Sequence, residues 1–445
     1  MKTVDNDFIH LVILNASSSA VILVLGLVSG SILAHLLGPV GRGEFATIQL
    51  YATLLAGIIT SGLPATMMYY IANKTTSEAG LYFTTGASIA ILISIPIALL
   101  GFYLIPYLLA TQDLRIVSMA QLYLWFIPLA ICTSFLLANI QARMEIQLWN
   151  FLRIVSALLW VVPLIVLFYV DDIDTSTVTK TYLISLVVQV IFIVFLTRNK
   201  IPKSCKIQSS LVKPIIKYSL PATISTYVQQ SNLKLDQIFI IYLLSPETLG
   251  FYVVSIAWSG IHTAVSTSVS SLVVPSLGKM DDDRKKSFLS KIRRVSLLIN
   301  LLMATIMIIA TPIGIELLFG DDFSPAVPIS YVLILSSIFA NMKYLYTEVL
   351  RGLELPKHPM FAELLGLVVS GMLFFMLIPL IGVVGVAVAS LVGYFATFVF
   401  LFHRIGKLLS LSITDLIIPQ LGDAIYIYNK SLQLLKSTFR KIHIH

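Results

Sequence analysis

The sequence has little charge. Only 12% of its 445 residues are Asp, Glu, Lys or Arg, whereas 57% are hydrophobic. Soluble globular proteins normally carry about 25% charged residues. With roughly half that share, the chain lacks enough polar side chains to cover a folded surface in water. The shortage of charge therefore excludes an ordinary soluble protein and indicates a protein embedded in a membrane.

Cysteine is also scarce, and the usual signatures of enzymes are absent. Cys132 lies in an apolar run and Cys205 in a basic stretch, so the two should lie at different depths and stay unpaired. The sequence contains no P-loop pattern and no Cys/His cluster with zinc-ligand spacing. No polar stretch is long enough to fold into a catalytic domain. We therefore predict no enzyme activity, no catalytic residue, no metal and no cofactor.

Long apolar runs fill most of the chain. Each is long enough to cross a bilayer as a helix, which takes about 20 residues. Twelve such spans are expected, at 9–37, 44–72, 81–109, 116–142, 149–170, 177–197, 214–244, 248–277, 292–319, 326–350, 360–381 and 383–403. The first span is too long, and its leader too acidic, for a cleaved signal peptide.

The loops between the spans predict the orientation. Lys and Arg gather in the loops 198–213 and 278–294, while the alternate loops are acidic or neutral. Basic loops stay in the cytoplasm, so twelve spans place both termini there. These loops carry no interleaved aromatic residues, and no nucleic-acid partner is expected.

A ten-residue pattern occurs twice, about half the chain length apart. Residues 36–45 have the sequence LLGPVGRGEF, and residues 243–252 have LLSPETLGFY. The repeat indicates an internal duplication, with a first six-helix bundle at 1–197, a basic linker at 198–213 and a second bundle at 214–403. Because each half has an even number of spans, the halves should be related by a pseudo-two-fold axis along the membrane normal.

The repeated pattern also has a local interpretation. Pro39 and Pro246 are expected to stop the preceding helix, and Gly43 and Gly250 to allow a tight reversal of the chain. The aromatic residue that ends each copy should lie at the level of the lipid headgroups.

Residues 404–445 form a basic tail. Leu432, Leu435 and Phe439 share one helical face, which favours an amphipathic helix on the membrane surface. A partly disordered tail is the alternative interpretation.

The span 214–244 is unusually polar. One helical stripe contains Tyr227, Gln230, Lys234 and Gln237, and the neighbouring stripe contains Ser225, Gln229, Asn232 and Asp236. A helix this polar should line water or a protein surface, because ionisable groups in lipid are costly. Lys234 and Asp236 are two residues apart, about 200° around the axis, so each is expected to need another partner.

The span 326–350 holds the second set of polar candidates. Glu348 and Arg351 have the i,i+3 spacing of a helical ion pair. Lys343 lies deeper and is either a substrate contact or half of a structural ion pair, whereas solvation at the interface is expected to account for Glu363. The candidates for ion coupling or structural pairing are Asp236, Glu348, Arg351 and His262.

Three segments resemble a known family. They are LLGPVGRGEFATIQL after the first span, LDQIFIIYLLSPETLGFYVVSIAW across the seventh and eighth, and GVVGVAVASLVGY in the last. Their order and spacing are similar to those of Wzx-type polysaccharide flippases of the MOP superfamily, which also contains MATE exporters and lipid II flippases. The resemblance implies an all-α, MATE-like fold of twelve transmembrane helices. Asp236 stands where such proteins often carry an acid, but Gln237 replaces the Arg that often follows it.

The resemblance further implies a function. The protein is expected to flip undecaprenyl-pyrophosphate-linked oligosaccharide repeat units, for O-antigen or capsule synthesis, across the bacterial cytoplasmic (inner) membrane. Membrane lipid, a polysaccharide polymerase and glycosyltransferases are the implied partners. The pyrophosphate would contact the cations Lys234 and Lys343. The sugars would contact the polar and aromatic candidates Gln230, Asn232, Tyr227 and Tyr344. A MATE-like, cation-coupled exporter of small molecules is the alternative, followed by a membrane scaffold or a membrane-embedded transferase.

Overall fold

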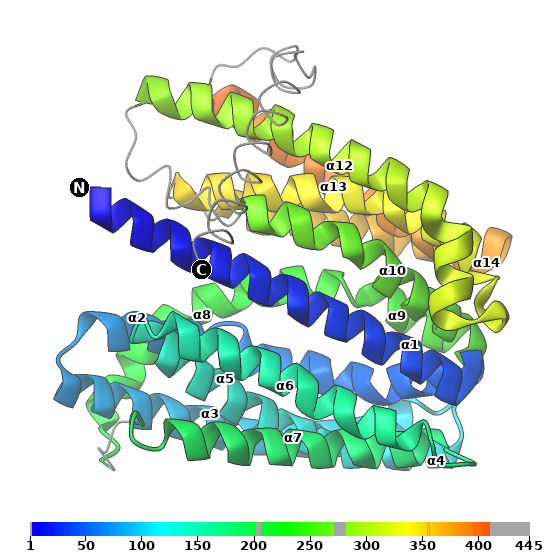
Figure 1. Cartoon of the computed structure of the whole chain (residues 1–445), viewed down its shortest axis with the longest axis horizontal. Coiled ribbons are helices and arrows are strands. Elements are labelled where there is room, and N and C mark those ends of the chain that lie inside the picture. Colours follow the sequence, from blue (N-terminus) through cyan, green and yellow to red (C-terminus); the bar gives the residue numbers. More distant parts are fainter. Residues whose placement is uncertain (1, 202–205, 271–281, 354, 356, 410–445) are drawn as a thin grey trace, which may run out of the picture. The chain divides into compact units, whose positions relative to one another are not determined.

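The computed structural model describes residues 2–201, 206–270, 282–353, 355 and 357–409. Within these ranges the chain is helical and contains no β-strand (Figure 1). Most of the predicted basic tail lies outside the described residues, and so does the first part of the basic loop 278–294.

The helices follow one another with short connections. The first half contains α1 (Lys2–Thr60), α2 (Leu63–Asn73), α3 (Thr76–Leu108), α4 (Leu114–Leu122), η1 (Tyr123–Trp125), α5 (Phe126–Ala142), α6 (Ile146–Leu167) and α7 (Thr175–Thr197). The second half contains α8 (Ser209–Asn232), α9 (Leu235–Leu243), α10 (Pro246–Ser270), α12 (Asp282–Phe319), η2 (Asp321–Phe323), α13 (Ala326–Gly352) and α14 (Lys357–Leu409).

Eight of the described helical stretches are long and apolar enough to cross a membrane. Two of them, Ser17–Ala72 and Lys357–Leu408, have 56 and 52 residues, enough for more than one crossing. Each bends at a glycine with positive φ, Gly38 at 62° and Gly382 at 59°, a conformation in which a Cβ atom would be strained. The count of twelve spans stays a prediction, because α8, α9 and α10 are not among the eight.

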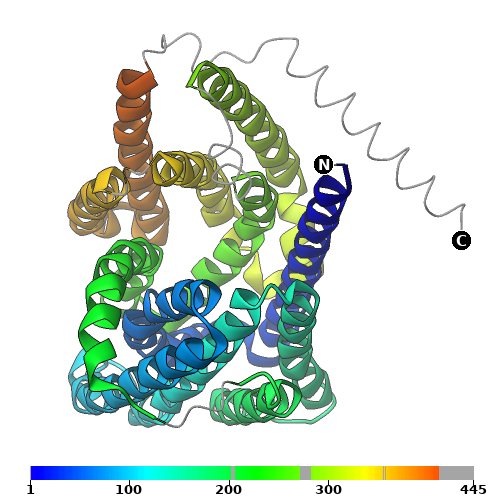
Figure 2. The same ribbon diagram turned by 90° about the vertical axis from the view of Figure 1, so that its left-hand side faces the viewer.

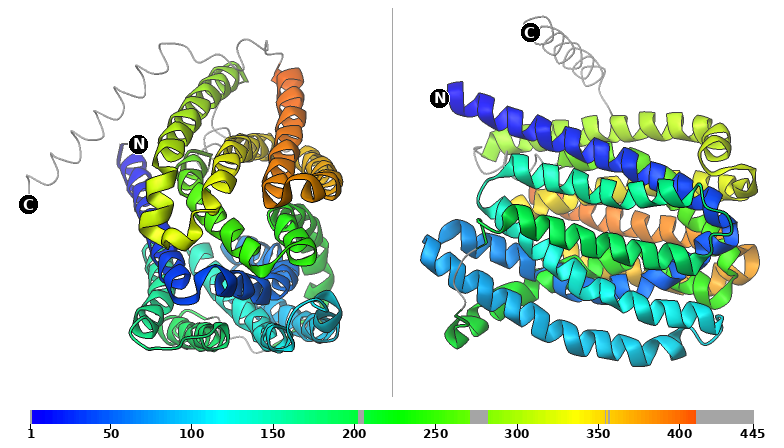
Figure 3. Two further views of the ribbon diagram at one scale, coloured as in Figure 1. Left: turned by 90° about the vertical axis from the view of Figure 1, so that its right-hand side faces the viewer. Right: turned by 60° about the horizontal axis from the view of Figure 1, so that its bottom comes forward.

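Packing divides the chain into two compact units. Unit 1 comprises residues 1–258, 312–329 and 376–386, and unit 2 comprises the rest. In unit 1, α1 packs against α3, α4, α5 and α6, and α8 packs against α1, α2 and α3. Figure 3 shows α3, α5, α6 and α7 running alongside one another. This division differs from the predicted boundary at 198–213, and the two six-helix bundles stay a prediction.

Unit 2 has an apolar core of its own. Leu289 from α12, Tyr346 and Val349 from α13, and Leu401 from α14 are buried together. Figure 2 shows these three helices in yellow-green to orange. The two arms of α14 approach closely, since a Cβ at Gly366 would lie 2.9 Å from the carbonyl oxygen of Gly393.

The two copies of the repeated pattern pack against each other in unit 1. A Cβ built on Gly43 overlaps the carbonyl oxygen of Pro246 and lies 2.9 Å from the nitrogen of Gly250. Reciprocally, a Cβ on Gly250 overlaps the carbonyl oxygen of Pro39. Each glycine therefore allows the proline-bearing turn of the other copy to approach its backbone. We call this contact the repeat crossing, and the end of unit 1 where it lies the repeat end.

The crossing corrects the local interpretation of the pattern. Gly43 and Gly250 are helical and reverse nothing; the left-handed residue is Gly38. Pro246 begins α10, and Pro39 directly follows the kink. Proline suits the first position of a helix because the N–H that it lacks would have no partner there.

The expected headgroup position of the aromatic residues is also wrong. Phe45 is 2% exposed and Tyr252 is fully buried. Phe45 packs against Trp160, with ring centroids 6.4 Å apart, and against Tyr182. Both rings lie inside the protein because the helices that follow the repeat have neighbours on that face.

We predict that Gly43→Ala and Gly250→Ala each destabilise the protein. The added methyl group meets backbone rather than a flexible side chain, so helices must separate at a cost of about 1–3 kcal/mol. Gly26→Ala, on the same helix α1 with nothing within 4 Å of its Cβ, is the control. Thermal unfolding in detergent measures the effect, and equal melting temperatures for all three variants would contradict the crossing.

Candidate functional site

The polar span 214–244 is interrupted at its most polar segment. Helix α8 ends at Asn232 and α9 begins at Leu235, with Leu233 and Lys234 between them. The N–H of Lys234 still donates to the carbonyl oxygen of Ser231, at 3.0 Å. The expected single helix is thus two helices, and Lys234 stands at the break.

Asp236 lies in the first turn of α9 and is 5% exposed. Its Oδ2 accepts a hydrogen bond of 2.6 Å from the hydroxyl of Tyr252, and its Oδ1 accepts one of 2.7 Å from the N–H of Gln237. A carboxylate is favoured at a helix N-terminus because unpaired N–H groups point towards it. Asp236 is therefore anchored to the second copy of the repeat.

Lys234 has weaker contacts. Its Nζ donates to Oε1 of Gln237 over 3.4 Å, and Asp236 attracts its charge without an ion pair within 4 Å. The side chain is half-buried. The expectation that Lys234 and Asp236 do not pair directly agrees with this geometry.

Arg42, which the sequence analysis did not single out, belongs to the same region. It is close enough to Lys234 for the two positive charges to repel each other. Its Nε is buried without a hydrogen-bond partner among the described residues. The signal was present in the repeat: Arg42 aligns with Leu249, so only the first copy carries a cation there.

The other candidates of α8 contact unit 1 itself. Oε1 of Gln230 accepts a hydrogen bond of 3.2 Å from the hydroxyl of Ser61. A Cβ on Gly57 would lie 3.3 Å from the ring of Tyr227, and Asn232 is 6% exposed. Tyr227 and Gln230 therefore pack α8 against the C-terminal end of α1 and the residue that follows it.

Lys343 belongs to unit 2, where its ammonium group forms an ion pair with a buried carboxylate. Its Nζ lies 2.8 and 2.9 Å from the carboxylate oxygens of Glu363, and the side chains are 4% and 3% exposed. The ring of Tyr394 lies 4.5 Å below the ammonium group. The expectation that interfacial water solvates Glu363 is wrong, since this residue is the buried partner of Lys343. Of the two interpretations of Lys343, the contacts favour the ion pair.

The remaining candidates of α13 form the contact that their spacing predicts. Nη1 of Arg351 lies 2.8 Å from Oε1 of Glu348. Tyr344 lies one helical turn before Glu348, is half-buried, and interacts electrostatically with both charged residues. Any role of these three residues in ion coupling or substrate binding stays a prediction.

His262 lies in a buried polar cluster of unit 2. Its Nδ1 is 2.9 Å from the hydroxyl of Ser337, and its Nε2 is 2.8 Å from Oδ1 of Asn300 and 2.9 Å from Nδ2 of Asn341. The amide of Asn341 also donates to Asn300 over 2.8 Å. The cluster joins α10, α12 and α13 and satisfies polar groups that burial would otherwise leave unpaired.

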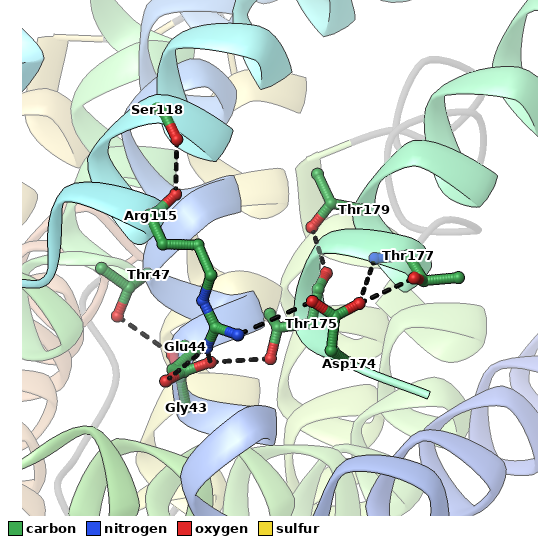
Figure 4. Close-up of polar contacts among 9 residues, drawn as sticks. All are labelled: Gly43, Glu44, Thr47, Arg115, Ser118, Asp174, Thr175, Thr177 and Thr179. Carbon is green, nitrogen blue, oxygen red and sulfur yellow. Dashed lines mark hydrogen bonds and ion pairs between the residues drawn. The ribbon is translucent and has the colours of Figure 1, made fainter. Parts of the chain in front are cut away.

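An ionic network connects helices at the repeat end of unit 1 (Figure 4). Arg115 from α4 lies 3.1 Å from the buried carboxylate of Glu44 and 3.6 Å from that of Asp174. The hydroxyl of Thr175 donates to Glu44 over 2.7 Å. Asp174 caps α7, and hydrogen bonds from Thr177, above all from its hydroxyl, hold the pKa of Asp174 below its ordinary value. The network joins α1, α4 and α7 directly beside the repeat crossing.

We predict that Lys343 and Glu363 act as a structural pair. Glu363→Gln leaves a buried ammonium without its counter-charge and should lower stability by about 3–5 kcal/mol. The double variant Lys343→Met, Glu363→Leu removes both charges and should recover most of that stability together with transport. Thermal unfolding and a transport assay check both. A stable double variant without transport would instead assign Lys343 to the substrate.

Three solved structures share the fold. A lipid II flippase MurJ in an inward closed conformation matches with a TM-score of 0.72 and 16% identity, covering 96% of this chain and 93% of that one. An inward-facing multidrug resistance MATE transporter matches with a TM-score of 0.65 and 13% identity, covering 89% and 95%. A MOP superfamily transporter from Pyrococcus furiosus matches at 0.63 and 13%, covering 90% and 96%. At such identities the likeness shows the fold alone.

No curated protein sequence matches the chain as a relative. The family model described as "Polysaccharide biosynthesis protein", however, matches residues 12–280, more than half of the chain. The all-helical structure and its apolar helices agree with the MOP transporter fold. The chain therefore belongs to the polysaccharide biosynthesis protein family, and its fold is the one found in the solved MOP superfamily structures.

Proposed function

We propose that the protein flips polyprenyl-pyrophosphate-linked oligosaccharide repeat units across the bacterial cytoplasmic membrane, for surface polysaccharide synthesis. The pair of cations Arg42 and Lys234 carries this proposal. Two neighbouring positive charges repel each other strongly where water is scarce. The positive charges of Arg42 and Lys234 repel each other, and one guanidinium nitrogen of Arg42 lacks a hydrogen-bond partner among the described residues; both observations support an anion site in this region.

A pyrophosphate matches this arrangement. A guanidinium group offers a planar fork of N–H donors that binds phosphate oxygens in pairs, and an ammonium group adds a point charge with three donors. Asp236 is already engaged by Tyr252 and Gln237, so it leaves the two cations available. The polar surroundings of the break offer hydrogen-bond partners for the first sugar.

The alternative, a MATE-like exporter of cations, is less consistent with the same charges. A site for a cationic substrate needs a net negative charge, because like charges inside the membrane exclude each other. Arg42, Lys234 and Asp236 together carry a net positive charge. The likeness to MATE structures supports the shared fold, and the charges support an anionic rather than a cationic substrate.

The predicted orientation of the protein in the membrane is consistent with this direction of transport. Basic loops place the linker 198–213 and both termini in the cytoplasm, where a lipid-linked repeat unit is assembled, and the repeat end then faces outward. Alternating movement of the two six-helix bundles would carry the head group across while the lipid tail stays in the bilayer. Glycosyltransferases that supply the repeat unit and a polymerase that consumes it are the proposed partners.

We predict that deleting the gene causes polyprenyl-linked repeat units to accumulate on the cytoplasmic side. Extracted lipid-linked glycans, compared with surface polysaccharide by gel and mass spectrometry, measure this. Normal surface polysaccharide in a deletion strain without a second flippase would refute the proposed function.

We predict that Arg42→Gln and Lys234→Gln each lower transport about ten-fold or more, because each removes a charge-assisted contact of about 1.5–3 kcal/mol. Thermal stability should stay equal or rise, since either change relieves the repulsion between the cations. Lys217→Gln, an exposed position on α8, is the matched control and should retain transport. Loss of stability in parallel with transport would mean that the two cations serve the fold.

A further inference from the structure

A third cation without a counter-charge lies at the opposite end of unit 1 from the repeat crossing. Arg153 is in α6, seven residues after its first residue and therefore about 10 Å along the helix axis. Its Nη1 contacts only neutral acceptors, Oδ1 of Asn15 at 3.4 Å and Oδ1 of Asn150 at 3.3 Å. Among the described residues no carboxylate pairs with it.

Arg153 resembles Arg42 and Lys234 in lacking a carboxylate partner, whereas several other cations of the described helices have one. Arg115, Lys343 and Arg351 each lie within 4 Å of a carboxylate. An unmatched guanidinium in a membrane span is costly, and such groups usually mark a pathway for a ligand or an ion.

Arg153 borders a cavity of about 320 Å³ between α2, α5 and α6. The lining combines one cation, one large aromatic face, an amide and a hydroxyl with small and apolar side chains. The residues are Pro64, Ala65, Met68, Ser134, Leu137, Ala138, Gln141, Trp149 and Arg153. We call this cavity the Arg153 pocket.

The polar groups of the pocket are arranged for recognition. The guanidinium carbon of Arg153 lies over the indole of Trp149, 4.4 Å from the ring centroid, and both side chains line the pocket. Ser134 donates its hydroxyl hydrogen to the carbonyl oxygen of Ile131, which leaves its lone pairs as acceptors. The amide of Gln141 borders the same space and makes no side-chain hydrogen bond among the described residues. A mainly apolar cavity with a few convergent polar groups is typical of a small-ligand site.

We infer that the Arg153 pocket binds a sugar ring that carries an anionic group, either a phosphate or a carboxylate. Arg153 binds the anion through paired N–H donors, the indole of Trp149 covers the apolar face of the ring, and Gln141 and Ser134 bind its hydroxyl groups. The inference rests on the proposed function and extends it: the pocket selects lipid-linked glycans whose sugar next to the pyrophosphate, or within the repeat unit, is acidic.

A lipid headgroup is the other source of phosphate at this end of a membrane protein. A headgroup needs the cation, but it needs neither an indole face nor a free amide. The combination of Trp149, Gln141 and Arg153 in one cavity therefore favours the saccharide.

Tryptophan fluorescence tests the inference, since Trp149 is one of only four tryptophans in the chain. Glucose 1-phosphate and glucuronate, added to the purified full-length protein in detergent, should change the emission of the wild type but not that of Trp149→Phe. Arg153→Gln should bind either probe at least ten-fold more weakly, Arg153→Lys should lose less, and glucose should bind more weakly than its charged forms. Arg198→Gln is the matched control, because Arg198 also stacks on an aromatic ring, Phe195, at 4.8 Å but is exposed.

Three binding results would overturn the inference. They are no emission change with either probe, equal binding by Arg153→Gln, and an effect of inorganic phosphate or of phosphatidylglycerol nanodiscs that matches the effect of the sugars. The last would identify a plain anion or headgroup site. A variant Arg153→Gln that still flips repeat units in cells while failing to bind probes leaves the proposed function intact and refutes selection by the pocket. If a variant lost flipping but bound the probes normally, the result would bear on the proposed function and leave ligand binding by the Arg153 pocket intact.

Discussion

The close approach of the two repeated segments constrains the rest of unit 1. At the repeat crossing, Gly43 and Gly250 each receive a proline carbonyl of the other copy, and a single added methyl group at either position would overlap backbone. The contact sets the positions of the residues beside it. Arg42 reaches the region of Lys234, and Tyr252 reaches the carboxylate of Asp236. The same turn presents the neighbouring glutamate to the ionic network of Figure 4.

Charges inside the membrane helices fall into two groups with different physical consequences. Lys343 and Arg115 have carboxylate partners, so their desolvation is offset within the protein. Arg42, Lys234 and Arg153 lack such partners among the described residues, so their desolvation is offset only if an anionic ligand pairs with them or water solvates them. The first group holds helices together, whereas we propose that the second stabilises an anionic substrate. A substrate with a pyrophosphate and an acidic sugar could then engage both unmatched regions, which lie at opposite ends of unit 1.

Part of the candidate site around Lys234 could be predicted from the sequence. Lys234 and Asp236 stood out because a polar cluster inside an apolar run is costly wherever it lies. Arg42 and Arg153 did not, since Arg42 lies in the repeated pattern that predicted a turn and Arg153 stands alone in an apolar run. The role of Lys343 also depended on a contact that spacing does not show. Its partner Glu363 lies on the next helix, and only the packing of α13 against α14 brings the two within 2.8 Å.

Composition and the periodic or repeated patterns along the chain were enough to predict the membrane class and the helical fold, and they revealed the repeated ten-residue pattern. The sequence also determined which residues would be costly to bury. Only the tertiary structure shows which buried charges have their desolvation offset by a partner inside the protein, because helix packing brings a counter-charge from another helix into contact. It likewise turned the repeated glycines from expected reversals into contact points, since the need for a residue without a Cβ arose from the opposite copy. Whether Gly43 bends a chain or admits a neighbour depends on what lies across from it, and no local pattern records that.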